Sequence, residues 1–388
     1  AGIAVGGSVA CSYAYVRIVT PDDQLGKALG RWAAITAVVV IPLTIVGSGL
    51  AGLNWRAAFL LIPIAALACL VATPRLLPFT APVAEKRQLL GVSLAGLGVV
   101  GLLYGISQTA DHIVAEKTVI PVGVGILLVA AAAMIGLRSK NPSFPVRLFR
   151  NPQMLAASLA GGLWNLALAV AILQSSNLWQ YVNGVTPLYV SLLQLPTTLA
   201  IAVGSVVAGR LLSRRIDFRL LMFIGFAVAA SGFALMGAAS DAAVTVWFNI
   251  GMVGGGLGAG AAGTVQSKLL LSLSPPKYLG SVSASRTTFG QIGYAIGLAG
   301  SAVITTVFTI RHLAGTDSHT FATAREELNA WFISNHQDAA LSDAYQQGFA
   351  RGMLVWTGVM LVGALICVVL TSMKSGRGTM DESLGVQE

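Results

Sequence analysis

Charge is scarce along this chain. Only 10% of its 388 residues are Asp, Glu, Lys or Arg, whereas 55% are hydrophobic. Soluble globular domains carry about 25% charged residues, and a chain with so few cannot cover its surface with groups that water solvates. The deficit therefore excludes an ordinary soluble domain and predicts an integral membrane protein whose surface faces lipid.

Cysteine and histidine are also rare, and neither is grouped. The three cysteines, Cys11, Cys69 and Cys367, lie in separate apolar stretches, which is typical of small buried side chains and not of a disulfide framework. The four histidines fall outside the apolar stretches and lack the spacing of metal ligands. No Ser, His and Asp set is placed to converge within the membrane. The sequence therefore gives no support for a metal site, a cofactor or an enzyme.

Long apolar runs without charge are frequent. A transmembrane helix needs about 20 such residues. The run 151–209 is too long for one helix, and it divides at the polar stretch 177–187. The runs predict an all-α integral membrane protein with eleven transmembrane helices. The runs are 1–16, 32–55, 57–74, 88–110, 118–137, 151–209 (two helices), 220–240, 242–267, 287–310 and 352–373.

Positive charge is distributed unevenly over the loops between these helices. When the loops are assigned alternately to two sides, 19 of the 24 Lys and Arg residues fall on one side. Cytoplasmic loops hold the excess of Lys and Arg in membrane proteins, so this side, which includes the C-terminus, is predicted to be cytoplasmic. The net charge of +9 then reflects topology, and nucleic-acid binding is not supported.

The helix predicted at 242–267 is rich in small residues. The stretch Gly258–Gly263 matches the GxGxxG pattern, but a dinucleotide site requires that pattern between a strand and a helix. Rows of small residues at four-residue spacing predict close packing of helix backbones instead. The two rows are Gly251, Gly255, Ala259 and Gly263, and Gly254, Gly258 and Ala262.

Two residues of the helix predicted at 32–55 favour bending. Pro42 removes one backbone hydrogen bond, and Gly47 permits a change of direction. We interpret both as conformational elements of a moving helix. An ordinary kinked membrane helix is the alternative.

Uncharged polar and aromatic side chains are present within the predicted spans. Such groups face the bundle interior or a cavity. Each alone is explained by a bond between helices, but as a set they suit a cavity for a large amphipathic solute, with rings for stacking and amides for hydrogen bonds. No Asp or Glu lies deep in a span, although proton coupling normally uses such a group. The predicted cavity residues are Trp164, Asn165, Gln180, Gln194, Gln291 and Tyr294.

The longest polar segment, 311–351, lies on the side opposite to the basic loops. Thr323 and Glu326 have the spacing of a capping box ahead of Leu328 and Trp331. We interpret the segment as a short amphipathic helix on the outer surface. A connecting loop with one or two helical turns is the alternative.

Several stretches together resemble one transporter family. They are DDQLGKALGRW at 22–32, NWRAAF at 54–59, NPSFPVRLFR at 141–150, QYVNG at 180–184 followed by Pro187 and Leu195-Pro196, the basic loop 209–219, and the segment 280–293. In this order they resemble the fourteen-spanner drug:proton antiporter family of the major facilitator superfamily. On this resemblance the eleven helices correspond to the family's fourth to fourteenth, and the first three would precede residue 1.

The resemblance implies a major facilitator fold with a substrate cavity between two bundles, exposed to either side in turn as the bundles rock. Arg210, Arg214 and Arg215 would form a cytoplasmic gate, and simple anchoring by positive charge is the alternative. The implied parts are the remainder of an N-terminal bundle (1–77), a linker with two inserted helices (78–150), a C-terminal six-helix bundle (151–372) and a mobile cytoplasmic tail (373–388).

The function implied by the resemblance is secondary transport across the cell membrane. A monomer surrounded by membrane lipids would export amphipathic or cationic drug-like compounds in exchange for protons, without a cofactor. Export of an endogenous lipid or cell-envelope metabolite would use the same fold with a more apolar cavity. A non-transporting sensor or a channel-like protein is the alternative from another class, but the sequence shows neither a soluble sensor domain nor a selectivity filter.

Overall fold

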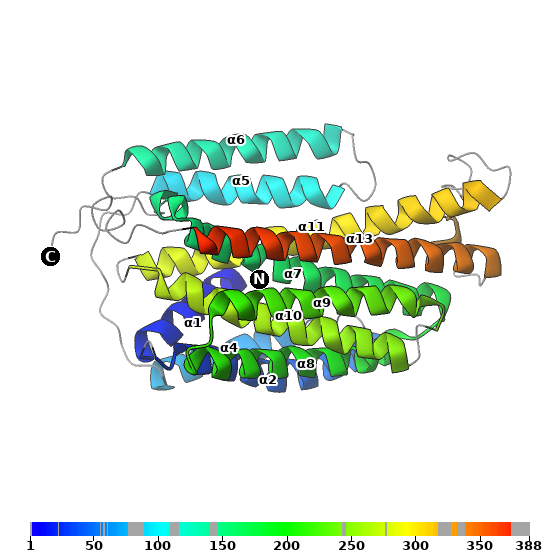
Figure 1. The fold of residues 1–388 in the computed structure, drawn as a ribbon, viewed down its shortest axis with the longest axis horizontal. Coiled ribbons are helices and arrows are strands. Elements are labelled where there is room, and N and C mark those ends of the chain that lie inside the picture. The colour runs from blue at the N-terminus through cyan, green and yellow to red at the C-terminus, as the bar shows by residue number, and fades with distance from the viewer. Residues whose placement is uncertain are drawn as a thin grey trace.

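The fold is helical throughout the part of the chain that the structure describes, and no strand occurs there. In this computed structural model the helices lie roughly parallel to the long axis of the molecule (Figure 1). The all-α fold class is therefore confirmed. The described residues are 2–21, 23–54, 56, 59, 61–76, 89–108, 116–139, 146–242, 246–275, 278–316, 327–328, 330–332 and 338–373.

Each of the eleven predicted spans coincides with one α-helix in the described part of the chain. Eight helices of that part are long and apolar enough to cross a membrane. The α-helices are α1 (Gly2–Val19), α2 (Leu25–Leu53), α4 (Leu61–Leu76), α5 (Leu89–Gln108), α6 (Glu116–Arg138), α7 (Pro152–Asn177), α8 (Pro187–Ser213), α9 (Phe218–Ala238), α10 (Val246–Ser272), α11 (Leu279–Thr316) and α13 (Ala339–Ser372). Two short elements flank α7, the 3-10 helix η1 (Val146–Arg150) and the π-helix η2 (Leu178–Val182).

The helices extend beyond the charge-free runs that predicted them. Lys268, Arg286 and Arg351 lie within α10, α11 and α13, so the prediction that they occupy loops is wrong. A helix continues as long as its backbone hydrogen bonds continue, and a long basic side chain near its end can reach a polar partner. The Lys268 ammonium, for example, donates to the carbonyl oxygen of Leu212 at 3.3 Å.

The polar segment 311–351 is partly built into the bundle. Its capping-box residues lie outside the described residues, but Leu328 and Trp331 are helical and buried. The Trp331 ring lies 5.8 Å from that of Tyr345 on α13, centroid to centroid. The apolar side of this short helix therefore contacts protein, and its placement on the outer surface stays a prediction. The predicted tail lies, after Met373, outside the described residues.

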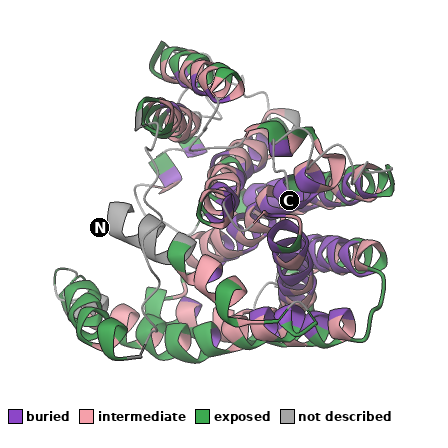
Figure 2. Ribbon diagram, turned by 90° about the vertical axis from the view of Figure 1, so that its left-hand side faces the viewer, coloured by how far each residue is buried: buried purple, intermediate pink, exposed green. Residues whose placement is uncertain are grey.

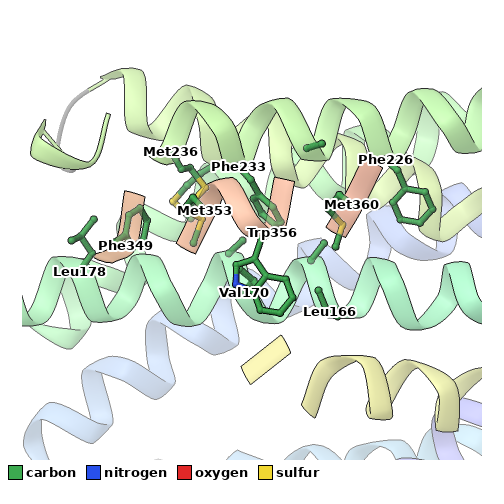
Figure 3. Packing of buried hydrophobic residues seen from close by; sticks show 14 of the residues in the cluster. Leu166, Val170, Leu178, Phe226, Phe233, Met236, Phe349, Met353, Trp356 and Met360 are labelled. Atoms are coloured by element: carbon green, nitrogen blue, oxygen red, sulfur yellow. The ribbon is translucent and has the colours of Figure 1, made fainter. Parts of the chain in front are cut away.

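The C-terminal bundle, formed by α7, α8, α9, α10, α11 and α13, holds most of the buried residues (Figure 2). Large apolar side chains from α7, η2, α9 and α13 converge in its core (Figure 3). Because lipid tails are as apolar as Leu, this core is stabilised by close van der Waals packing rather than by escape from water. The residues labelled in Figure 3 are Leu166, Val170, Leu178, Phe226, Phe233, Met236, Phe349, Met353, Trp356 and Met360.

Small residues bring α10 into backbone contact with two neighbours, which confirms the close packing predicted for this helix. Gly251 and Gly258 lie against the backbone of α9. A second face, which the sequence analysis did not identify, lies against α8. A Cβ atom on Gly256 would stand 2.7 Å from the carbonyl oxygen of Thr197, and one on Gly260 would overlap that of Ile201.

The N-terminal helices contact the C-terminal bundle through α1 and α2. The helix α2 runs antiparallel to α8, with Gly26 against Gly209 at one end. Near the other end the hydroxyl oxygens of Ser48 and Ser191 lie 2.6 Å apart. The helices α5 and α6 pack side by side at one edge of the molecule, and α5 contacts α11 (Figures 1 and 2). The domain boundaries stay predictions.

The contact between α8 and α10 generates a prediction about stability. Gly260→Ala is expected to lower the thermal unfolding midpoint of the purified protein by several degrees, because overpacking costs about 1–3 kcal/mol. Gly254→Ala is the matched control on the same helix, since the nearest atom to its added Cβ would lie at 3.6 Å. Equal midpoints for the two variants would contradict the packing described for α8 and α10.

Candidate functional site

One end of the molecule gathers the helix ends that carry most of the positive charge. The start of α2 meets the end of α8, where Gly26 packs on Gly209. The start of α7 meets the end of α13, where Gln153 Nε2 donates to the carbonyl oxygen of Thr371 at 3.4 Å. We call this end, with the end of α10 and the start of α11, the basic end. The structure thus brings together loops that the charge count assigned to one side, and their cytoplasmic placement stays a prediction.

A cavity of about 290 Å³ lies between the N-terminal helices and the C-terminal bundle. Its described lining comes from α1 and α2 on one side and from α7, α8, α10 and α11 on the other. The lining combines aromatic rings, hydroxyls and amides with small residues. This composition can hold a solute with an apolar body and a few polar groups.

Three of the six predicted cavity residues belong to this lining, namely Trp164, Asn165 and Gln291. Asn165 Nδ2 donates to the carbonyl oxygen of Gly161 at 2.8 Å. Gly290 leaves room for that amide, because a Cβ atom there would stand 2.9 Å from Asn165 Nδ2. Gln291, one residue further along α11, is exposed at the cavity.

The other three predicted cavity residues lie outside the described lining. Gln180 lies in η2, and its amide donates to the hydroxyl of Ser176 at 2.7 Å. Gln194 Nε2 donates across to α7, to the carbonyl oxygen of Ile172 at 3.1 Å. Tyr294 is half-buried on α11. The two glutamine amides therefore both bond to α7, within the bundle.

Arg286 is a cavity residue that the sequence analysis missed. Its side chain is 8% exposed and lines the cavity. The guanidinium lies 3.7 Å from the ring centroid of Tyr13 on α1, and its Nε donates to the hydroxyl of Ser267 on α10 at 3.0 Å. A cation over an aromatic face is stabilised by the ring quadrupole.

The sequence contains a signal that Arg286 lies inside the protein. The stripe of Gly290, Gly293 and Gly297 recurs at helical spacing, and all three glycines face α7. Arg286 lies one turn before Gly290 on the same stripe. The stripe indicates a face packed inside the bundle, so it places Arg286 inside the protein rather than in a loop.

Trp164 presents an unused hydrogen-bond donor. Its ring packs on Gly263 of α10, where a Cβ atom would stand 3.2 Å from the indole. Its Nε1 is buried and has no hydrogen-bond partner among the described residues. A buried N–H group without an acceptor is costly, and because this nitrogen is enclosed, Trp164 contributes its ring to the cavity lining.

The roles predicted for the cytoplasmic gate residues, and for Pro42 and Gly47 as conformational elements, stay predictions. Arg210, Arg214 and Arg215 lie at the basic end, at or just after the last turn of α8, and are exposed. Pro42 lies within α2, which runs through it without interruption as far as Leu53. Gly47 precedes Ser48, whose hydroxyl meets that of Ser191.

Metal-binding and acidic groups are not found at this site in the part of the chain that is described. No cluster of three or more His, Cys, Asp or Glu residues occurs there. The described lining of the cavity includes no carboxylate. Its polar chemistry is that of hydroxyls, amides, two indoles and one guanidinium.

A helical membrane protein with a cavity between two groups of helices has the architecture of a membrane transporter. The sequence model of the Major Facilitator Superfamily matches residues 1–298, and the chain belongs to this superfamily. The family and the fold are those of transporters, which are not enzymes.

Relatives with curated names include proteins of antibiotic resistance and export. The chain is 28% identical to the methylenomycin A resistance protein of Streptomyces coelicolor, over 72% of this chain and 59% of the relative. It is 29% identical to the cephamycin export protein CmcT of Amycolatopsis lactamdurans, over 77% and 64%. It is 25% identical to the multidrug efflux pump LfrA of Mycolicibacterium smegmatis, over 77% and 59%. The chain thus spans about three-fifths of the length of these relatives.

The cavity geometry predicts which side chains water can reach. In a variant with its three cysteines replaced by Ala, Gln291→Cys is expected to react with a water-soluble maleimide, because this position is exposed at the cavity. Gln174→Cys is the control. Gln174 is fully buried, and its amide donates to the carbonyl oxygen of Ser301 at 2.8 Å.

Mass spectrometry after a fixed labelling time measures the adduct at each position. Gln291→Cys should be labelled and Gln174→Cys should not. Labelling of both positions, or of neither, would show that the cavity described here is not the water-accessible space of the folded protein.

Proposed function

We propose that this protein is a secondary transporter that exports amphipathic drug-like compounds across the cell membrane, driven by proton antiport. The observation that carries the proposal is the cavity between α1 and α2 on one side and the C-terminal bundle on the other. Its lining offers the rings of Trp32 and Trp164 for an apolar body and the amides of Asn165 and Gln291 for polar groups. The resistance and export proteins among the relatives support this class.

The proposed arrangement is that of the fourteen-spanner drug:proton antiporters. The protein would act as a monomer among membrane lipids, with the basic end and the C-terminus in the cytoplasm. The excess of Lys and Arg at that end supports this orientation. The greater length of the relatives is compatible with three helices before residue 1, as the resemblance implies.

Alternating access would operate at the contact between α2 and α8. At the basic end a Cβ atom on Gly30 would stand 2.8 Å from the carbonyl oxygen of Ser205, so the two helices approach closely there. Opening the cavity toward the cytoplasm would require these backbones to separate. Small residues suit such an interface, because they leave few interlocked side chains to disengage.

Compounds carrying a positive charge fit the described lining less well than neutral or anionic amphipathic compounds. The charged group among the described lining residues is Arg286, which repels a cation. We therefore propose amphipathic character, rather than positive charge, as the property that the cavity recognises.

Dye export from cells tests the proposal. Cells that express the protein should retain less of the neutral amphipathic dye N-phenylnaphthylamine than control cells, and a protonophore should abolish the difference. Asn165→Ala should reduce export severalfold, because it removes a polar contact of the cavity. Gln347→Ala, an exposed amide on α13, is the control and should export as the unchanged protein does.

The outcomes separate the parts of the proposal. Export that the protonophore leaves intact would contradict proton coupling but not transport. No export of the dye, together with an altered lipid or envelope-metabolite profile in cells lacking the gene, would contradict the drug-export proposal and favour an endogenous substrate.

A further inference from the structure

The charge pattern of the cavity carries an inference about its substrate. Arg286 is more than nine-tenths buried, yet its guanidinium has no carboxylate partner among the described residues. Its contacts there are the ring of Tyr13 and the hydroxyl of Ser267. With the Gln266 amide oriented so that both its ends are paired, Gln266 Oε1 also accepts from Arg286 Nε, at 3.2 Å.

These partners position the guanidinium without neutralising it. A buried charge within a membrane protein is costly unless an opposite charge or water compensates it. The ring and the two oxygens offset part of that cost, and they leave the positive charge available to the cavity. An anionic group placed in the cavity would complete the compensation, and a cationic group would increase the cost.

The hydrogen bonds of the lining hydroxyls support the same inference. Thr264 Oγ1 and Ser205 Oγ both donate to the carbonyl oxygen of Gly260, at 3.1 and 3.0 Å. Ser267 Oγ donates to the carbonyl oxygen of Gly263 at 2.6 Å. The protons of these hydroxyls are therefore already engaged by the backbone. The charged donor that remains for a solute among the described lining residues is the guanidinium of Arg286.

Arg286 and the ring of Trp164 are arranged along one face of α10. Trp164 packs on Gly263, and Arg286 bonds to Ser267, which lies one helical turn further along. The planar guanidinium suits a carboxylate or sulfonate, whose oxygen atoms can accept from its N–H groups. The rings of Trp32 and Trp164 are available to an attached apolar body.

We propose that the cavity binds amphipathic anions, and that Arg286 holds their carboxylate or sulfonate group while the aromatic rings of the lining contact the apolar part. This inference rests on the proposed function and narrows its substrate class. The site assigns Arg286 as a specificity-determining residue, because it distinguishes compounds by charge rather than by size.

Two dyes with the same arylamine skeleton test this inference. Anilinonaphthalene sulfonate carries a sulfonate that N-phenylnaphthylamine lacks. Both are titrated, by fluorescence, against the protein reconstituted in lipid nanodiscs, with empty nanodiscs subtracted. The unchanged protein should bind the sulfonate more tightly than the neutral dye.

The variants separate charge recognition from folding. Arg286→Gln should weaken binding of the sulfonate about tenfold or more, which is the effect expected for losing a hydrogen bond to a charged group. It should weaken binding of the neutral dye by a smaller factor, because that dye carries no acidic group for the guanidinium to hold. Arg286→Lys should retain part of the preference, because it keeps the charge but loses the planar fork. Arg31→Gln removes an exposed arginine of α2 near the basic end. It should change the affinity for neither dye.

Several results would contradict the inference that the cavity binds amphipathic anions. Equal affinity of the unchanged protein for both dyes, or an equal loss of both in Arg286→Gln, overturns the inference while the proposed function stands. A loss of sulfonate binding in Arg31→Gln as large as that in Arg286→Gln also overturns it, since general surface charge would then explain the preference. If the unchanged protein binds neither dye, both the inference and the proposed cavity are contradicted.

Discussion

The close approach of α10 to its neighbours determines the geometry of the rest of the molecule. In a bilayer, helices gain nothing from leaving water, so they associate only where their atoms make close contact. Gly256 and Gly260 allow that contact with α8, and Gly251 and Gly258 allow it with α9. A single helix with glycine at its contact positions on two faces therefore fixes the positions of both neighbours. Because α8 in turn lies along α2, the same contact places the N-terminal helices against the C-terminal bundle and defines where the cavity can form.

The polar groups of the cavity follow from the same constraint. Backbone and side-chain groups surrounded by lipid must find partners within the protein, and hydroxyls do so by donating to nearby carbonyl oxygens. Ser205 and Thr264 converge on the carbonyl oxygen of Gly260, at the point where α8 and α10 touch. The cavity wall is thus held by its own hydrogen bonds. What it presents to a solute is decided by the polar groups whose hydrogen bonds are not all used in this way, chiefly Arg286.

The helices were predictable from sequence, but the rotation of each helix about its axis was not. Some twenty apolar residues predict a helix whatever they face, so each predicted span coincides with a described α-helix, although only eight described helices are long and apolar enough to cross a membrane. A side-chain amide can bond equally well to a solute or to a neighbouring helix. Gln194 bonds to α7, whereas Gln291 faces the cavity, and residue type does not separate the two. Arg286 was assigned to a loop because charge was taken to end a span. The glycine stripe that follows it at helical spacing would have placed it on a packed face.

Arg286 connects the cavity to the movement that a transporter needs. Its guanidinium rests on Tyr13 of α1, and its Nε bonds to Ser267 of α10, so one side chain contacts both groups of helices that enclose the cavity. Any motion that separates α1 from α11 must remove the aromatic ring from the guanidinium and so change the stabilisation of a buried charge. The free energy of that charge therefore differs between conformations. A solute that contacts the guanidinium shifts the balance of conformations to the extent that it binds one of them better. Under the proposed assignment, substrate recognition and access to the cavity are linked through a single buried arginine.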